Sequence, residues 1–208
     1  FTIRSKQDYI DAFHDYDFEK LFGKKGYAYF TNGNYNLNII GVRRDNDNKV
    51  TNKFDDVMVV IYRDNNNNIV RECFDITTEP ELYYMKNPAN SKGAGILVPN
   101  QYRGCWEIGF HQGKYKALCQ RKPVTVYRDN DRNSVYDLES NHTDFGLFGV
   151  NIHKAGNNST QVDKWSAACQ VFANSSDFET FMKLCNNQID NGMGKTFTYT
   201  LLNEEDLV

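Results

Sequence analysis

The chain has 208 residues, of which 40% are hydrophobic and 14% aromatic, so it is long enough to bury one sizeable core and predicts a single domain. Its 24 basic and 27 acidic residues give a formal charge of -3 and are scattered, which argues against a nucleic-acid partner. No stretch approaches 18 apolar residues and no basic-then-apolar leader is present, so neither a membrane span nor an intact signal peptide is expected.

The N-terminal residues predict an amphipathic helix over 5–22, because their apolar side chains recur at spacings of three and four. Ser5 is its expected N-cap and Gly23 its expected end. We therefore divide the chain into an N-terminal helical segment, residues 1–25, and a β-rich domain, residues 26–208.

Short strands rich in β-branched and aromatic residues follow, separated by clusters of Asn and Asp. They are expected over 27–31, 36–44, 55–64 and 69–78, the last two joined as a hairpin by an Asn turn. Residues 124–140 repeat the V-Y-R-D-N pattern of that hairpin and predict a second one.

In this second hairpin Asp129, Asp131 and Asn133 alternate as in a calcium loop. The glycine and the terminal glutamate of an EF-hand are missing, so we expect no metal site here.

The remaining chain predicts further short strands over 93–124, a strand over 144–154 that reaches His153, and a final strand over 196–202. A second helix is expected after Ser176, which is followed three residues later by Glu179 in the manner of a capping box. The fold class is therefore mainly β, a sandwich or partly open barrel with an N-terminal helix and one late helix at its margin.

Five cysteines are spread along the chain with no C-x-x-C pair, so neither a zinc knuckle nor a complete disulfide framework is indicated, and no cofactor is expected. Cys169 follows His153 by 16 positions, across a polar loop. A nucleophilic cysteine needs a neighbouring base, and histidine is the usual one. The small residues before Cys169 favour an exposed thiol and a nearby oxyanion hole.

The segments N-I-H at 151–153 and S-A-A-C at 166–169 resemble the catalytic signature of the L,D-transpeptidase (YkuD-like) family, an I-H-G-type histidine followed by S/T-H-G-C. The chain departs from this signature at Ala167, Ala168 and Val171, where the family has His, Gly and commonly Arg. The upstream β-rich region agrees with such a domain.

The resemblance implies that Cys169 attacks a carbonyl of a peptidoglycan stem peptide and forms a thioester, while His153 moves the proton. Supporting or substrate-binding roles are expected for Ser166, Gln170, Trp165 and His111. Because the His and Gly of the signature are replaced, we favour an L,D-peptidase over a transpeptidase. The implied location is the cell envelope, the extracellular space or a virion.

Two other interpretations remain open from the sequence. The first is a non-catalytic β-rich binding or structural module, such as a phage tail component or a cell-surface protein, in which Cys169 is merely buried. The second is a papain-like peptidase, which would place its cysteine early in the chain and ahead of its histidine.

Overall fold

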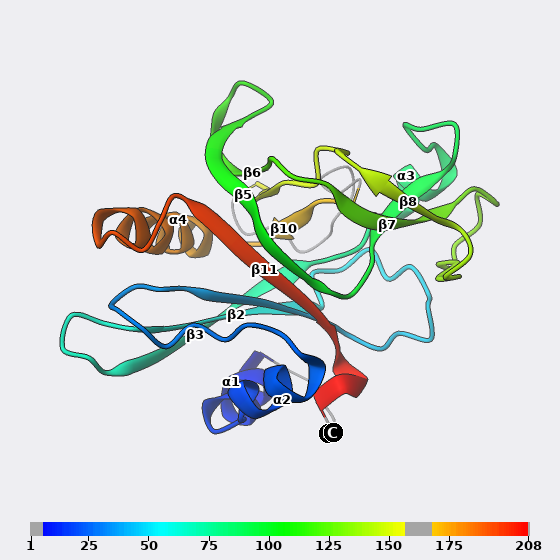
Figure 1. The fold of residues 1–208 in the computed structure, drawn as a ribbon. Coiled ribbons are helices and arrows are strands. Elements are labelled where there is room, and N and C mark those ends of the chain that lie inside the picture. Colours follow the sequence, from blue (N-terminus) through cyan, green and yellow to red (C-terminus); the bar gives the residue numbers. More distant parts are fainter. Residues whose placement is uncertain (1–5, 157–167, 208) are drawn as a thin grey trace.

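The computed structural model describes residues 6–156 and 168–207, and its centre is a closed eight-stranded barrel (Figure 1). Around the barrel the strand order is β1-β11-β5-β6-β9-β10-β3-β2. The prediction of a mainly β fold is confirmed, with the sheet fully closed. The barrel strands are β1 (Asn38–Arg43), β2 (Asp56–Arg63), β3 (Ile69–Thr77), β5 (Gln101–His111), β6 (Tyr115–Gln120), β9 (Ile152–Lys154), β10 (Gln170–Phe172) and β11 (Thr196–Asn203).

A separate three-stranded sheet lies beside the barrel, in the order β4-β7-β8 (Figure 1). Its strands are β4 (Ala94–Leu97), β7 (Val124–Asp129) and β8 (Thr143–Gly146), all antiparallel to their neighbours. The helices are α1 (Lys6–His14), α2 (Phe18–Lys25), α3 (Leu82–Lys86), α4 (Ser175–Asp190) and the final 3-10 turn η1 (Glu204–Leu207). Within the described ranges, every helix is too short or too polar to cross a membrane.

The N-terminal segment forms two helices, so the prediction of one helix ending at Gly23 was wrong. Asp17 accepts a hydrogen bond from the Lys20 amide and caps α2, which runs through Gly23 and ends where Gly26 adopts a left-handed backbone. The buried apolar residues of both helices, Phe13 and Phe18 among them, pack on the outer side of β1 and β2. These two strands are consequently buried on both faces, which explains their long apolar runs.

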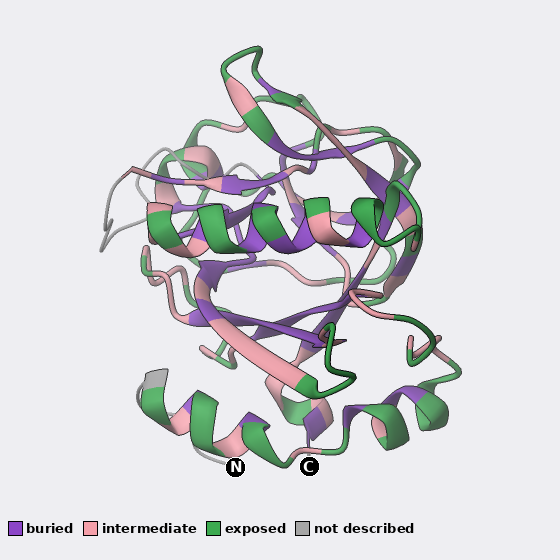
Figure 2. Ribbon diagram, turned by 90° about the vertical axis from the view of Figure 1, so that its left-hand side faces the viewer, coloured by how far each residue is buried: buried purple, intermediate pink, exposed green. Residues whose placement is uncertain are grey.

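Helix α4 closes the core on another side of the barrel. Its predicted apolar face is buried and its opposite face is exposed (Figure 2). Phe178, Phe181 and Leu184 join the main core around Trp106 and Phe172. The helix is capped by Asn174, whose side chain accepts from the Ser176 and Asp177 amides, so the expected cap at Ser176 lies two residues too late.

Three predicted strand segments differ from the structure. Residues 27–31 form no strand, because their backbone groups bond to the amide side chains of Gln101 and Asn38 in place of a neighbouring strand. Residues 124–140 form no hairpin, since β7 pairs with β4 and β8 while Val135 makes only an isolated bridge to Lys49. Residues 144–154 split between β8 of the small sheet and β9 of the barrel.

Candidate functional site

Strands β9 and β10 bring the two predicted catalytic residues onto one surface. They are parallel neighbours, with His153 paired to Val171. Ile152 points into the main core, so the residues before and after it in β9 face the other way. On that other side Ala155 packs with Cys169 and Val171. His153 lies two residues before Ala155 on the same face, which makes it a diagonal neighbour of Cys169.

His153 is held in a defined orientation and is only 3% exposed. Its Nδ1 lies 2.9 Å from the carbonyl oxygen of Lys154, and a carbonyl only accepts, so Nδ1 carries the proton and Nε2 is the basic nitrogen. The Tyr115 hydroxyl lies 3.4 Å from the same Nδ1 and also donates to the Lys154 carbonyl. The tautomer required of a base acting through Nε2 is therefore fixed by β9 itself.

His111 lies against this imidazole. The two rings are stacked, with centroids 4.0 Å apart and an angle of 14° between their planes. The Asn151 amide nitrogen lies 3.1 Å from His111 Nδ1 and donates to it. The structure therefore places His111 directly beside His153. A role of His111 in the site stays a prediction.

Cys169 is buried, with 9% of the residue exposed, so the expectation of an exposed sulfur was wrong. Its Sγ lies 3.4 Å from the Gly149 carbonyl, to which it donates, and the Ala155–Val171 cluster covers another side. The preceding residue, Ala168, has a φ of 85°, in the left-handed region that favours glycine. The resembled signature has Gly at this position, and holding a residue other than glycine in this conformation costs about 1–3 kcal/mol.

Both reactive groups are neutral at pH 7 in this geometry. Burial and the neighbouring His111 lower the pKa of His153 to about 4. Burial raises the pKa of Cys169 to about 11, although the Asn151 backbone N–H opposes this rise by favouring the thiolate. Roughly one molecule in 10,000 then carries the thiolate at pH 7.

A groove of about 320 Å³ lies beside the nucleophile segment. It is formed by α3, the start of β4, part of β7 and residues 147–148, and Ala168 lies in its wall. Gly149, whose carbonyl holds the Cys169 thiol, follows directly after these residues. The thiol is thus flanked by groove-lining chain on two sides.

Arg128 is the cationic side chain of this groove. Its guanidinium lies over the Phe148 ring, 4.7 Å from the centroid, and donates to the Gly93 carbonyl. Its Nε lies 3.4 Å from an Asp144 carboxylate oxygen but has no hydrogen bond of good geometry, while its side chain is 11% exposed. A carboxylate-bearing ligand would find a suitable partner here.

The other predicted residues fall elsewhere. Gln170 is buried inside the barrel, where its Oε1 accepts from the Tyr199 hydroxyl at 2.7 Å and its amide donates to the Thr78 carbonyl, so its side chain supports the core next to the site. Trp165 and Ser166 lie outside the described residues.

Comparison of the chain with protein-family models, with curated proteins and with solved structures found no match. Sequence reasoning missed the groove, because α3 and β4 carry no catalytic motif and reach the site only through the fold. The sequence also carries no signal for Tyr115, whose hydroxyl lies 3.4 Å from His153 Nδ1.

Proposed function

We propose that the protein is a cysteine-dependent, peptidoglycan-active enzyme of the L,D-transpeptidase-like kind, with Cys169 as nucleophile and His153 as base. The observation that carries the proposal is the placement of both residues on one face of adjacent parallel strands, next to a groove. The Nδ1 contact that leaves Nε2 basic, and the glycine-like backbone at Ala168, support it further.

In the proposed reaction Sγ attacks the carbonyl carbon of an L,D-linked residue while its proton passes to Nε2 of His153. The C–N bond then breaks, the leaving amine takes that proton, and a thioester remains on Cys169. Water or another amine attacks the thioester and releases the thiol. Because the neutral pair is strongly favoured at rest, proton transfer accompanies the attack and does not precede it.

Stem peptides carry several carboxylates, and Arg128 supplies a cation in the groove that suits them. We expect Arg128→Gln to raise KM with little change in kcat, which is the pattern of lost binding common to ground state and transition state. Arg121→Gln is the matched control, because the Arg121 side chain is 48% exposed and pairs with Glu107 on β5, outside the groove lining.

The decisive experiment incubates purified muropeptides with the protein, with Cys169→Ala and with His153→Gln, and follows the products by mass spectrometry. We expect a change in muropeptide mass with the unaltered chain and with Cys73→Ala, but not with the two site variants. Addition of one water would identify hydrolysis, and joining of two stem peptides would identify transpeptidation. The same change with Cys169→Ala would refute the proposal.

A non-catalytic wall-binding module is the second candidate, and the 9% exposure of Cys169 favours it. It predicts that muropeptides bind with unchanged mass, and that Cys169→Ala binds as tightly as the unaltered chain. Binding measured by calorimetry beside the mass assay separates the two functions.

A further inference from the structure

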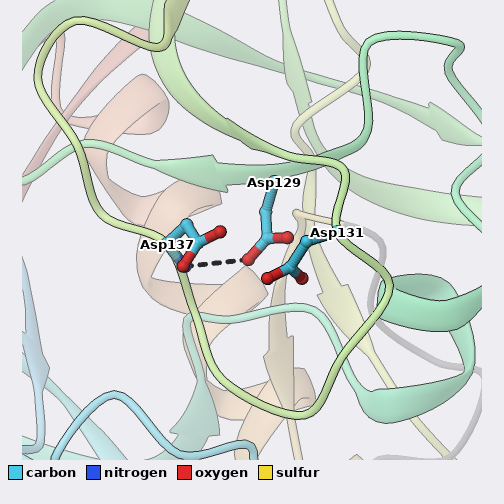
Figure 3. A group of neighbouring side chains, drawn as sticks. All are labelled: Asp129, Asp131 and Asp137. Atoms are coloured by element: carbon cyan, nitrogen blue, oxygen red, sulfur yellow. Dashed lines mark hydrogen bonds between the residues drawn. The ribbon is translucent and has the colours of Figure 1, made fainter.

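The loop that follows β7 gathers three carboxylates at one point. Asp129 is the last residue of β7, and Asp131 and Asp137 lie further along the loop. One oxygen atom of each lies within 4.8 Å of the others, and the three side chains point toward one another (Figure 3). Three negative charges at such spacing repel each other unless a cation lies between them.

Asp129 is aimed into this cluster from the protein interior. It is 1% exposed, its Oδ2 accepts from the Asp137 backbone N–H at 2.8 Å, and its Oδ1 is buried with no hydrogen-bond partner. A buried carboxylate oxygen left without a partner carries a desolvation cost, which a bound cation would remove.

His142, the basic side chain that acts electrostatically on Asp137, pairs with Glu139 and not with the cluster. Throughout the described part of the chain, no Lys, Arg or His forms an ion pair with Asp129, Asp131 or Asp137. The cluster is therefore strained electrostatically as it stands.

We propose that Asp129, Asp131 and Asp137 form a calcium-binding site. Calcium takes oxygen ligands at about 2.3–2.6 Å, so two ligand oxygens on one ion lie at most about 5 Å apart, as the cluster allows. The donors are all carboxylates, with no His or Cys in the group, which disfavours zinc and copper. An EF-hand loop needs a carboxylate near its end, and the sequence comparison identified none here. In the structure Asp137 supplies such a carboxylate.

The site would tie the loop to the wall of the groove. Tyr136, next to Asp137, is buried and donates from its hydroxyl to the Pro80 carbonyl at 2.7 Å. Asp129 on β7 pairs with Ala94 on β4, and Pro80, Ala94 and Arg128 all line the groove. Calcium would consequently stabilise the small sheet and the groove together. This inference is independent of the proposed enzymatic function.

The test measures the melting temperature of the full chain in EDTA and in calcium chloride, with calorimetric titration of calcium. At a calcium concentration 100-fold above Kd we expect the melting temperature to rise by about 5 to 10 °C. The same concentration of magnesium should give a much smaller rise, because magnesium demands near-octahedral geometry and keeps its water.

Asp131→Asn is the test variant, since Asp131 is exposed and the substitution keeps the side-chain volume. We expect it to melt no lower than the unaltered chain in EDTA, because one repelling charge is gone, and to lose the calcium response. Asp64→Asn is the control: Asp64 lies in the turn of the other Y-R-D-N segment, at the position that corresponds to Asp129, and accepts from the Asn66 and Asn68 amides. Asp64→Asn should keep the calcium response. An unchanged calcium response in Asp131→Asn, the absence of any calcium response in the unaltered chain, or an equal response to magnesium would overturn the assignment.

Discussion

The buried imidazole of His153 makes the stability of the fold sensitive to acid. In the unfolded chain a histidine titrates near 6.5, whereas burial and His111 lower the pKa of His153 to about 4 in the folded protein. Between these two values the unfolded state binds more protons, so the free energy of unfolding falls as the pH falls. From about pH 7 to about pH 4.5 the loss due to His153 amounts to about 2.4 kcal/mol.

The measurement is urea unfolding at several pH values, followed by tryptophan fluorescence. Asp56 and Glu79 have raised pKa values of about 6 and about 8, caused first by burial, and they act in the opposite direction. The informative quantity is therefore the difference in slope between the unaltered chain and His153→Gln. His14→Gln is the control, because the side chain of His14 is 77% exposed. If His153→Gln loses stability with acid as steeply as the unaltered chain, the imidazole is not buried in its neutral form and the reasoning fails.

Two further predictions concern packing near the site. Gly41→Ala would place a Cβ 1.9 Å from the Tyr199 hydroxyl inside the barrel, so we expect the free energy of unfolding in urea to fall by about 1–3 kcal/mol. Gly23→Ala on α2 is the control: its Cβ would meet no atom within 4 Å, so it should stabilise the fold by up to about 1 kcal/mol. Equal effects of the two would contradict the crowding argument. Tyr136→Phe leaves the Pro80 carbonyl without its donor and should cost about 1–3 kcal/mol, measured the same way; a neutral result would show that this buried bond contributes nothing.

Local patterns predicted those elements whose backbone partners lie near in sequence. The β2–β3 hairpin follows from two apolar runs around an Asn turn, and α4 follows from its helical spacing. Closure of the barrel was beyond such patterns, because β1 pairs with β11 across most of the chain and no local signal encodes that pairing. Residues 27–31 show the opposite error: their composition favours a strand, but side-chain amides from distant residues satisfy the backbone.

The candidate site likewise has features that the sequence predicts and features that depend on contacts between distant residues. The order of His153 and Cys169 and the polar loop between them are visible in sequence, and parallel pairing of β9 with β10 brings the two residues together. The burial of Cys169 is not visible, because it depends on contacts with Phe54, Gly149 and Ala155, which lie elsewhere in the sequence. The groove is not visible in the sequence either, because its walls come from five parts of the chain.

The two Y-R-D-N segments are similar in sequence, but one forms a hairpin turn and the other begins a candidate ion site. In the first, Asp64 stands alone among asparagines and closes a hairpin by accepting from backbone amides. In the second, Asp131 stands where the first has Asn66, and the carboxylates of Asp131 and Asp137 gather beside Asp129. The loop instead leaves β7, and its carboxylates converge at the edge of the sheet that bounds the groove. The convergence of these three carboxylates creates the electrostatic demand that a divalent cation would satisfy.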